Sequence, residues 1–233
     1  MKSNPPFWYQ WLWLVPAVVG GALTFMMLFV LPPDRVVHGL DDFIFKIMPL
    51  VCAVLAVAMF PQKPPFLSLF LLLGVVFYMG YLDSGFFLRI EAWIRAVLDD
   101  NAKAGFSAFY QFNLLVNSFT ILFALFAYRL GGGRTASVLK LGLSSVLIML
   151  SGLNDLTMWI MYPWPNGERP FVFDWASHVE VFIGREPNLY HMLGFFAAHL
   201  ILIGVILALP LQRWLDQLKA RWLLGKRADA ASA

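Results

Sequence analysis

The chain has 233 residues, of which 60% are hydrophobic, 16% are aromatic and 13% are charged. Soluble domains carry about 25% charged residues, so this composition excludes a soluble globular protein. The 17 Lys and Arg residues exceed the 14 Asp and Glu residues by a net charge of only +3. They form no basic stripe with interleaved aromatic residues, which argues against nucleic acid as a partner.

Six apolar segments predict six transmembrane helices, because a bilayer core of about 30 Å takes about 20 residues of helix. The first segment runs past Gly20-Gly21-Ala22 without an A-x-A cleavage site, so we expect a retained helix rather than a signal peptide. The sequence thus predicts an all-α, polytopic protein with a single transmembrane domain over residues 1–233. In chain order, the segments are about 9–31, 44–60, 65–82, 106–129, 137–162 and 189–211.

The distribution of charge predicts that both termini face the inner side of the membrane. In that orientation the inner side holds ten basic and two acidic residues, a net charge of +8. The outer side holds seven basic and twelve acidic residues, a net charge of −5. Because cytoplasmic loops of membrane proteins carry the excess of Lys and Arg, we expect the N-in, C-in orientation in a bacterial cytoplasmic membrane.

Two outer connections are predicted to be long: residues 83–105 between helices three and four, and residues 163–188 between helices five and six. Loops of that length in a compact protein are usually functional or disordered. The small and polar residues 225–233 predict a disordered tail. The second long loop is predicted to be ordered at the membrane interface because it contains aromatic residues at Trp164, Phe171, Phe173 and Trp175.

A weak internal repeat relates residues 65–130 to residues 137–211. The sequence MGYLDS at 79–84 matches SGLNDL at 151–156, and each is followed by a Trp-containing outer segment and another apolar helix. Duplication of a helix–loop–helix unit explains the match, and chance similarity between apolar sequences is the alternative.

The four histidines all fall on the predicted outer side: His38, His178, His191 and His199. The single cysteine, Cys52, lies in an apolar run, so any metal would be held by nitrogen and oxygen ligands. His199 lies eight residues beyond His191, which puts it about 12 Å further along a helix, so the two cannot easily share an ion. A hydrogen-bonded packing residue is the alternative role for His199.

The spacing Asp174-x3-His178-x12-His191 predicts a three-ligand metal site. If the Asp174 stretch is helical, the i, i+4 spacing puts the carboxylate and the first imidazole on one face. Two imidazoles and one carboxylate suit copper, zinc or iron. Glu180 is a candidate for orienting one of the imidazoles. The alternative is an interfacial loop whose polar residues are simply solvated.

Asp155 is unusual because a carboxylate inside a membrane span is costly and points by default to function. It follows Asn154 near the outer end of the fifth predicted helix. The two residues are candidates for supporting the metal site or for capping an interrupted helix.

The Asp174, His178 and His191 spacing, with the last residue opening a transmembrane helix, resembles the copper-site motif of the C subunit of the copper-dependent membrane monooxygenases, the particulate methane and ammonia monooxygenase family. Two further segments resemble short motifs of that subunit more weakly: Gly39-Leu40-Asp41-Asp42-Phe43 and Gly152-Leu153-Asn154-Asp155. Here the motif precedes the last helix, whereas in the family further helices follow it. Thr157, Met158 and Trp159 also stand where the family has a nearby histidine.

The resemblance implies an integral-membrane subunit of a hetero-oligomer that oxidises a small apolar or gaseous substrate with O2. It implies copper on Asp174, His178 and His191, at an outer, periplasmic site. Two other functions stay open: a non-catalytic accessory or assembly subunit of a larger membrane complex, and a small transporter, which Asp155 and the repeat suggest. The sequence names neither the substrate nor the partner subunits.

Overall fold

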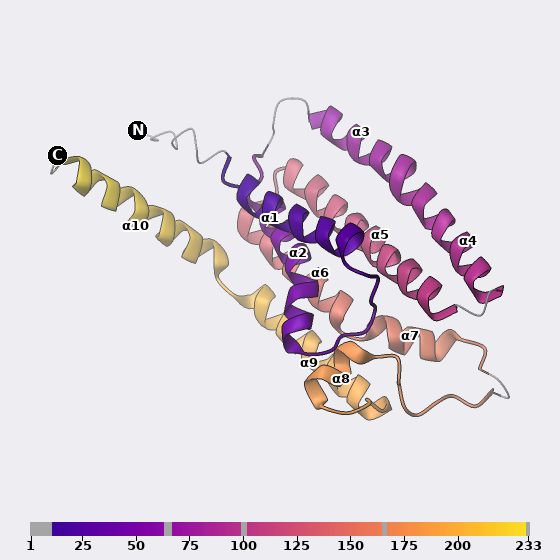
Figure 1. Cartoon of the computed structure of the whole chain (residues 1–233). Helices are drawn as coiled ribbons and strands as arrows, with labels where there is room; N and C mark the ends of the chain where they lie inside the picture. The colour runs from indigo at the N-terminus through magenta and orange to yellow at the C-terminus, as the bar shows by residue number, and fades with distance from the viewer. Residues whose placement is uncertain (1–10, 63–66, 99–101, 165–166, 232–233) are drawn as a thin grey trace.

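The computed structural model describes residues 11–62, 67–98, 102–164 and 167–231. Within these residues every regular element is a helix, and a lone β-bridge joins Val172 to Asn188. The predicted all-α class is therefore confirmed. Figure 1 shows the helices packed side by side, with the start of α1 and the whole of α10 at one end and α8 at the other. We call these two ends the α10 end and the α8 end.

Helix α1 (Leu14–Phe25) continues into a π-helical turn, η2 (Met26–Val30), and packs along α2 (Leu40–Met59). The two helices approach closely at Gly20, where an added Cβ would lie only 2.9 Å from the Cβ of Cys52. A larger residue at that position would therefore push the two backbones apart. Together, α1 and η2 form an apolar helix shorter than a full span.

The third helical segment is longer than predicted. Helix α3 (Leu67–Phe77), the π-helical turn η3 (Tyr78–Asp83) and α4 (Ser84–Leu98) follow one another without a break and pack along α5 (Ala102–Leu130). The prediction of a long outer loop between helices three and four is therefore wrong, because most of that stretch is α4. Residues 99–101, between α4 and α5, lie outside the described part.

Charged residues in α4 led to that error, and the structure accommodates them on the helix. Arg95 pairs with Glu91 one turn away, at 2.5 Å between Nη2 and Oε1. The Arg89 guanidinium lies 3.8 Å from the centre of the Phe112 ring on α5. Ion pairs at i, i+4 and cation–π contacts both stabilise charges on helix surfaces, so charge alone did not mark a loop here.

Helix α6 (Thr135–Leu150) and α7 (Leu153–Met161) are two parts of one predicted segment, bent by 45° at Ser151-Gly152. The predicted outer loop that follows contains the short helix α8 (Ser177–Ile183). Helix α9 (Leu189–Ala208) ends before Pro210.

The chain closes with α10 (Leu211–Ala231), so residues 225–231, predicted to be disordered, continue a helix instead. Residues 232–233 of that predicted tail lie outside the described part.

The main core lies where α2, α5 and α6 meet. Gly142 of α6 packs so closely there that an added Cβ would lie 2.5 Å from Val54 of α2. Apolar side chains packed at this density stabilise the bundle. The buried members of this core are Leu50, Val54, Ala58, Leu125, Val138 and Val146.

Four described helices are long and apolar enough to cross a membrane, or five if the bent α6–α7 pair is one span. The sequence predicted six; when the bent pair is counted as one span, the difference is the first helix, which is too short within the described residues. Apolar side chains cover most of the outside of these helices, which is compatible with an integral membrane protein in contact with lipid. The four single spans are Leu40–Met59, Leu69–Leu98, Gly105–Leu130 and Leu189–Ala208.

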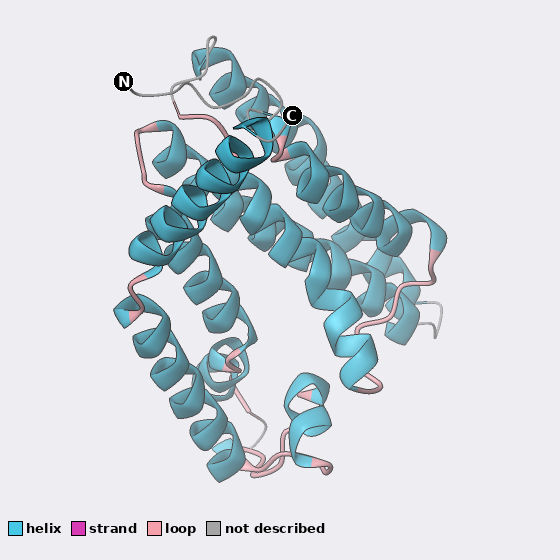
Figure 2. Cartoon of the chain, turned by 90° about the vertical axis from the view of Figure 1, so that its left-hand side faces the viewer, coloured by secondary structure: helices cyan, strands magenta, loops and turns pink. Residues whose placement is uncertain are grey.

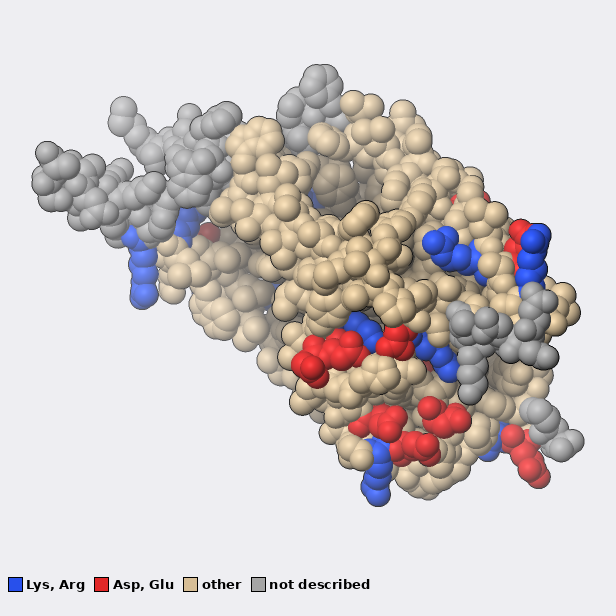
Figure 3. Space-filling view, in the orientation of Figure 1, with Lys and Arg blue, Asp and Glu red and all other residues tan. Residues whose placement is uncertain are grey.

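Most charged side chains lie toward the two ends of the helices, although α4 carries Arg89, Glu91 and Arg95. Figure 3 shows acidic side chains with basic ones between them at the α8 end, and basic side chains beside α10. Figure 2, turned by 90°, shows α8 and its loops closing the bundle at the opposite end from α10. The side of the membrane that each end faces stays a prediction.

Candidate functional site

The candidate site lies at the α8 end and begins with the break between α6 and α7. Gly152 has φ +75°, the left-handed region that favours glycine. Ser151 is buried; its hydroxyl donates to the Ile148 carbonyl at 2.7 Å and accepts from the Leu153 amide at 3.3 Å. These bonds replace the helical ones lost at the bend, so α7 leaves in a new direction.

The loop after α7 is held in place by backbone and indole hydrogen bonds. Trp159 Nε1 donates to the Pro170 carbonyl at 2.7 Å, and the Phe173 amide donates to the Pro187 carbonyl at 2.8 Å. A second apolar core lies beneath the loop, and α8 packs against it between α7 and α9. The buried members of this core are Leu156, Phe173, Ala176, Val179 and Met192.

Asp155 of α7 and His178 of α8 face each other beside this second core. Asp155 Oδ2 lies 3.7 Å from His178 Nε2, and the side chains are 17% and 22% exposed. Trp175 Nε1 donates to the other carboxylate oxygen at 3.1 Å. Burial of a carboxylate and an imidazole together is costly unless they pair, so this contact defines the site.

Burial lowers the pKa of His178 below its ordinary value of 6.5, and the neighbouring His199 lowers it further, whereas the charge of Asp155 opposes both. Phe195 separates the two imidazoles, with ring centres 6.2 Å from His178 and 4.4 Å from His199. The surroundings of His178 therefore favour the neutral imidazole, and the charge of Asp155 acts against this preference.

The three predicted metal ligands are not brought together. Asp174 is exposed and lies in the turn before α8, which begins at Ser177, so it does not share a helical face with His178. The expectation of a helix through Asp174 is wrong because Ala176 has a non-helical backbone conformation. No group of three His, Cys, Asp or Glu side chains that could hold a metal occurs among the described residues.

His191 is used instead as part of the N-terminal cap of α9. Its Nδ1 accepts from the Asn188 amide at 3.2 Å, while its own amide donates to Asn188 Oδ1 at 3.0 Å. Nε2, the other ring nitrogen, lies 3.0 Å from the Arg185 guanidinium, which can only donate. Both ring nitrogens of His191 therefore face hydrogen-bond donors of the chain itself.

The residues predicted to support the metal site have different positions. Asn154 is exposed, and Glu180 lies half-buried on α8, one turn from its start. His199 Nδ1 lies 2.9 Å from the Phe195 carbonyl in the preceding turn, the hydrogen-bonded packing role left open by the sequence. Of the four, only Asp155 directly faces a predicted ligand.

Sequence reasoning did not identify the role of Trp175 or the contact between Asp155 and His178. Residues 155 and 178 are separated by the rest of α7, a loop and a turn, so their spacing carries no helical signal. Trp175 was seen only as an aromatic interface residue, although a buried indole usually requires a hydrogen-bond acceptor. Ser177 links α8 to the connection before α2, because its hydroxyl accepts a hydrogen bond from the Val37 amide at 3.0 Å.

Comparison of the chain with protein-family profiles, curated proteins and solved structures gives no match.

Proposed function

We propose that the chain is an integral-membrane protein that takes up and releases a proton through Asp155 and His178, in the manner of a small proton-coupled transporter. One observation carries the proposal: the 3.7 Å contact between a carboxylate and an imidazole, both largely buried, at a break in a membrane helix. Ionisable residues within membrane-spanning segments mark ion and proton pathways, and Asp155 lies in α7, the second part of the bent span. Broken helices form the binding sites of many transporters.

The chemistry follows from the two groups. A proton that adds to His178 Nε2 makes an imidazolium, whose charge the Asp155 carboxylate stabilises at short range. Loss of that proton leaves a neutral imidazole beside a carboxylate that still accepts the Trp175 N–H. The two states differ in the attraction between α7 and α8, so the proton changes how firmly these helices hold together.

The bend at Gly152 supplies a place where that change can be absorbed. Gly152 lies close to one partner of the contact and to the core beneath it, since an added Cβ would be 4.0 Å from His178 Nε2 and 2.9 Å from Met192 Cε. A glycine in the left-handed region is a common hinge because no Cβ restricts its rotation. We infer that α7 moves relative to α6 when His178 changes its charge.

The experiment measures proton movement in liposomes that contain the purified protein and a pH-sensitive dye. A potassium diffusion potential set by valinomycin drives the flux. We expect the wild-type protein to acidify or alkalinise the interior according to the sign of the potential. Asp155→Asn and His178→Gln should each lower the rate of this pH change at least tenfold. Asp174→Asn is the matched control, because it removes an exposed carboxylate from the same loop.

The second candidate is the subunit of a copper-dependent monooxygenase. The spacing of Asp174, His178 and His191 and the family resemblance favour it, and all three residues belong to the α7–α9 region. The cap formed by His191 and the exposure of Asp174 do not fit copper, so we derive no step through the metal. Equal copper content in wild type, His178→Ala and His191→Ala would remove this candidate, and zinc or iron is tested in the same measurement.

Partner subunits are compatible with both candidates. Only 6% of the membrane window of α9 and 11% of that of α5 are buried within the chain. Lipid alone, or helices of other chains, can cover the exposed apolar faces of α9 and α5. The accessory-subunit alternative predicts that substitution of Asp155 or His178 lowers the yield of an assembled complex rather than its activity.

A further inference from the structure

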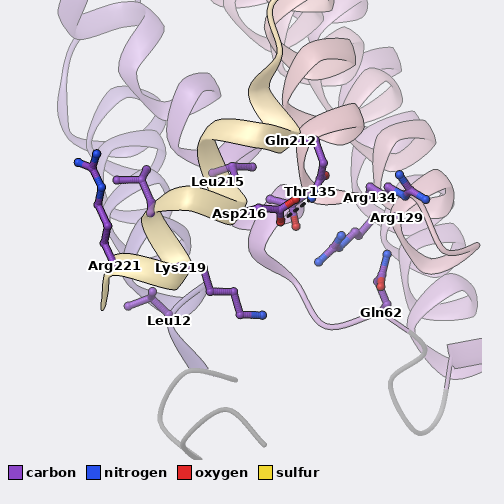
Figure 4. Close-up of a pocket in the computed structure, with 11 residues that line it drawn as sticks. Leu12, Gln62, Arg129, Arg134, Thr135, Gln212, Leu215, Asp216, Lys219 and Arg221 are labelled. Carbon is purple, nitrogen blue, oxygen red and sulfur yellow. Dashed lines mark hydrogen bonds between the residues drawn. The ribbon is translucent and has the colours of Figure 1, made fainter. Parts of the chain in front are cut away.

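A cavity of about 930 Å³ opens at the α10 end, between the first half of α10, the α5–α6 turn and the end of α2 (Figure 4). Lys219 extends from α10 toward that turn. Four cationic side chains and one carboxylate, that of Asp216, line the cavity. The carboxylate accepts a hydrogen bond from Gln212 Nε2 at 2.9 Å. The cationic residues are Arg129, Arg134, Lys219 and Arg221.

The wall formed by the α5–α6 turn is rigid. Gln62 Nε2 donates to the carbonyls of Gly132 and Gly133 at 2.9 and 2.8 Å. Arg129, only 7% exposed, donates from Nε to the Phe60 carbonyl and from Nη1 to the Gly133 carbonyl, both at 2.7 Å. A buried, hydrogen-bonded guanidinium thus places a fixed positive charge at the base of the cavity. Binding to a preorganised site costs less ordering of the protein.

The start of α6 adds to the positive potential. Arg134 is the N-cap residue of this 16-residue helix, but its side chain makes no capping hydrogen bond. The amides of the first turn point out of the helix end that lies at the cavity. Helix N-termini carry a partial positive charge and bind anions, phosphate above all. Arg134 and Thr135 both line the cavity, so the helix end and the basic side chains act on the same space.

Apolar surface lies directly beside this basic cavity. Leu12, Leu215 and Leu218 share its wall with the charged residues, and Leu218 is 62% exposed. Trp214, one turn earlier on α10, is 45% exposed. Exposed Trp and Leu next to Lys and Arg on one helix are typical of a helix that lies at the membrane surface. A soluble phosphate would gain nothing from these apolar contacts, whereas a lipid would.

We propose that this cavity binds the phosphate headgroup of an anionic phospholipid, with its acyl chains along the apolar side of α10. Lys219 and the N-terminus of α6 contact the phosphate, and Arg129 and Arg134 contribute their charges from the α5–α6 turn. The predicted orientation agrees, because it puts the α10 end on the cytoplasmic side, where anionic lipids give the membrane surface a negative potential. The site is separate from the Asp155–His178 contact at the opposite end.

The test measures lipid binding to the full-length protein in a neutral detergent, by native mass spectrometry and by thermal unfolding. The probes are phosphatidylglycerol, phosphatidylcholine and inorganic phosphate. We expect phosphatidylglycerol to bind and to raise the unfolding temperature, with little effect from the other two. Each basic residue near a membrane surface contributes about a fivefold change in affinity, so Arg134→Gln/Lys219→Gln should bind phosphatidylglycerol about 25-fold more weakly.

The matched control is Arg95→Gln/Arg213→Gln, which lowers the net charge by the same amount with residues outside the cavity. It should bind phosphatidylglycerol as the wild type does. Equal loss of binding in both double variants would show a non-specific charge effect and overturn the proposal. Equal binding of phosphatidylcholine, or of phosphate alone, would overturn the assignment to an anionic lipid.

Discussion

The two ends of the molecule use charge in opposite ways. At the α8 end, Asp155 and His178 are largely buried and face each other, so the charge of each depends on the other. At the α10 end, Arg129 is buried against backbone carbonyls, whereas Arg134 and Lys219 line an open cavity. The difference indicates that one end is suited to a change of protonation and the other to constant attraction of an anion.

The largest expected effect on stability comes from Arg129. Arg129→Met leaves the carbonyls of Phe60 and Gly133 without this donor, and we expect a loss of about 2–4 kcal/mol in the free energy of unfolding. Denaturation followed by Trp fluorescence measures it. Arg213→Met, an exposed residue of α10, should change the value by no more than about 0.5 kcal/mol. A loss of similar size in both variants would contradict the role assigned to Arg129.

The second largest effect on the free energy of unfolding is expected at Gly152, between α6 and α7. Gly152→Ala should cost about 2 kcal/mol, because alanine is strained at φ +75° and its Cβ also crowds Met192. Gly184→Ala is the control, since Gly184 has φ +73° but an added Cβ there meets nothing within 4 Å. We expect about 1 kcal/mol for that variant. Equal losses would show that only backbone strain matters and that Gly152 is not specially packed.

A smaller effect is the pH dependence at the α8 end. The pKa of His178 is lower in the folded protein than its ordinary 6.5, so the unfolded chain binds a proton more readily. Stability should therefore fall as the pH decreases below 6.5 and level off below the folded pKa. His178→Gln should remove this part of the profile, and His38→Gln, at an exposed residue, should keep it. An unchanged profile in His178→Gln would refute the assignment.

The smallest effect concerns Asp34, in the connection before α2. Burial raises its pKa, but hydrogen bonds from the Val36 amide and His38, and the charges of Lys46 and His38, outweigh it, so the pKa lies below 3.8. Its contribution to stability is present above 3.8 and is lost as the pH falls through the lowered value. Asp34→Asn should flatten the acid limb of the unfolding profile. A limb as steep as that of the wild type would show that this network contributes little.

Helix type and the polar ends could be predicted from the sequence because apolar runs and charge counts depend only on composition along the chain. Helix limits could not be predicted where charges lie on a helix, as in α4, since Glu91 and Arg95 pair only once the helix forms. The bend at Gly152 was visible as a glycine within an apolar run. Its angle depends on packing against Met192, which the sequence does not reveal.

The candidate site was predicted only in part. The sequence singled out His178 and Asp155 separately, but it paired His178 with Asp174 by assuming a helix that begins three residues too early. The non-helical Ala176 turns the chain so that Trp175 and His178 face α7. The predicted repeat has irregular backbone at both matching positions, η3 and the Gly152 bend, and it stays a prediction.

The pairing of Asp155 with His178 is tested most directly by nuclear magnetic resonance of protein labelled at histidine, titrated from pH 8 to pH 4. In the wild type, the carboxylate of Asp155 partly opposes the lowering of the His178 pKa. We predict that Asp155→Asn lowers the His178 pKa further, whereas Asp174→Asn leaves it unchanged. An unchanged His178 titration in Asp155→Asn, with a shift in Asp174→Asn, would contradict the pairing and restore Asp174 as the partner of His178.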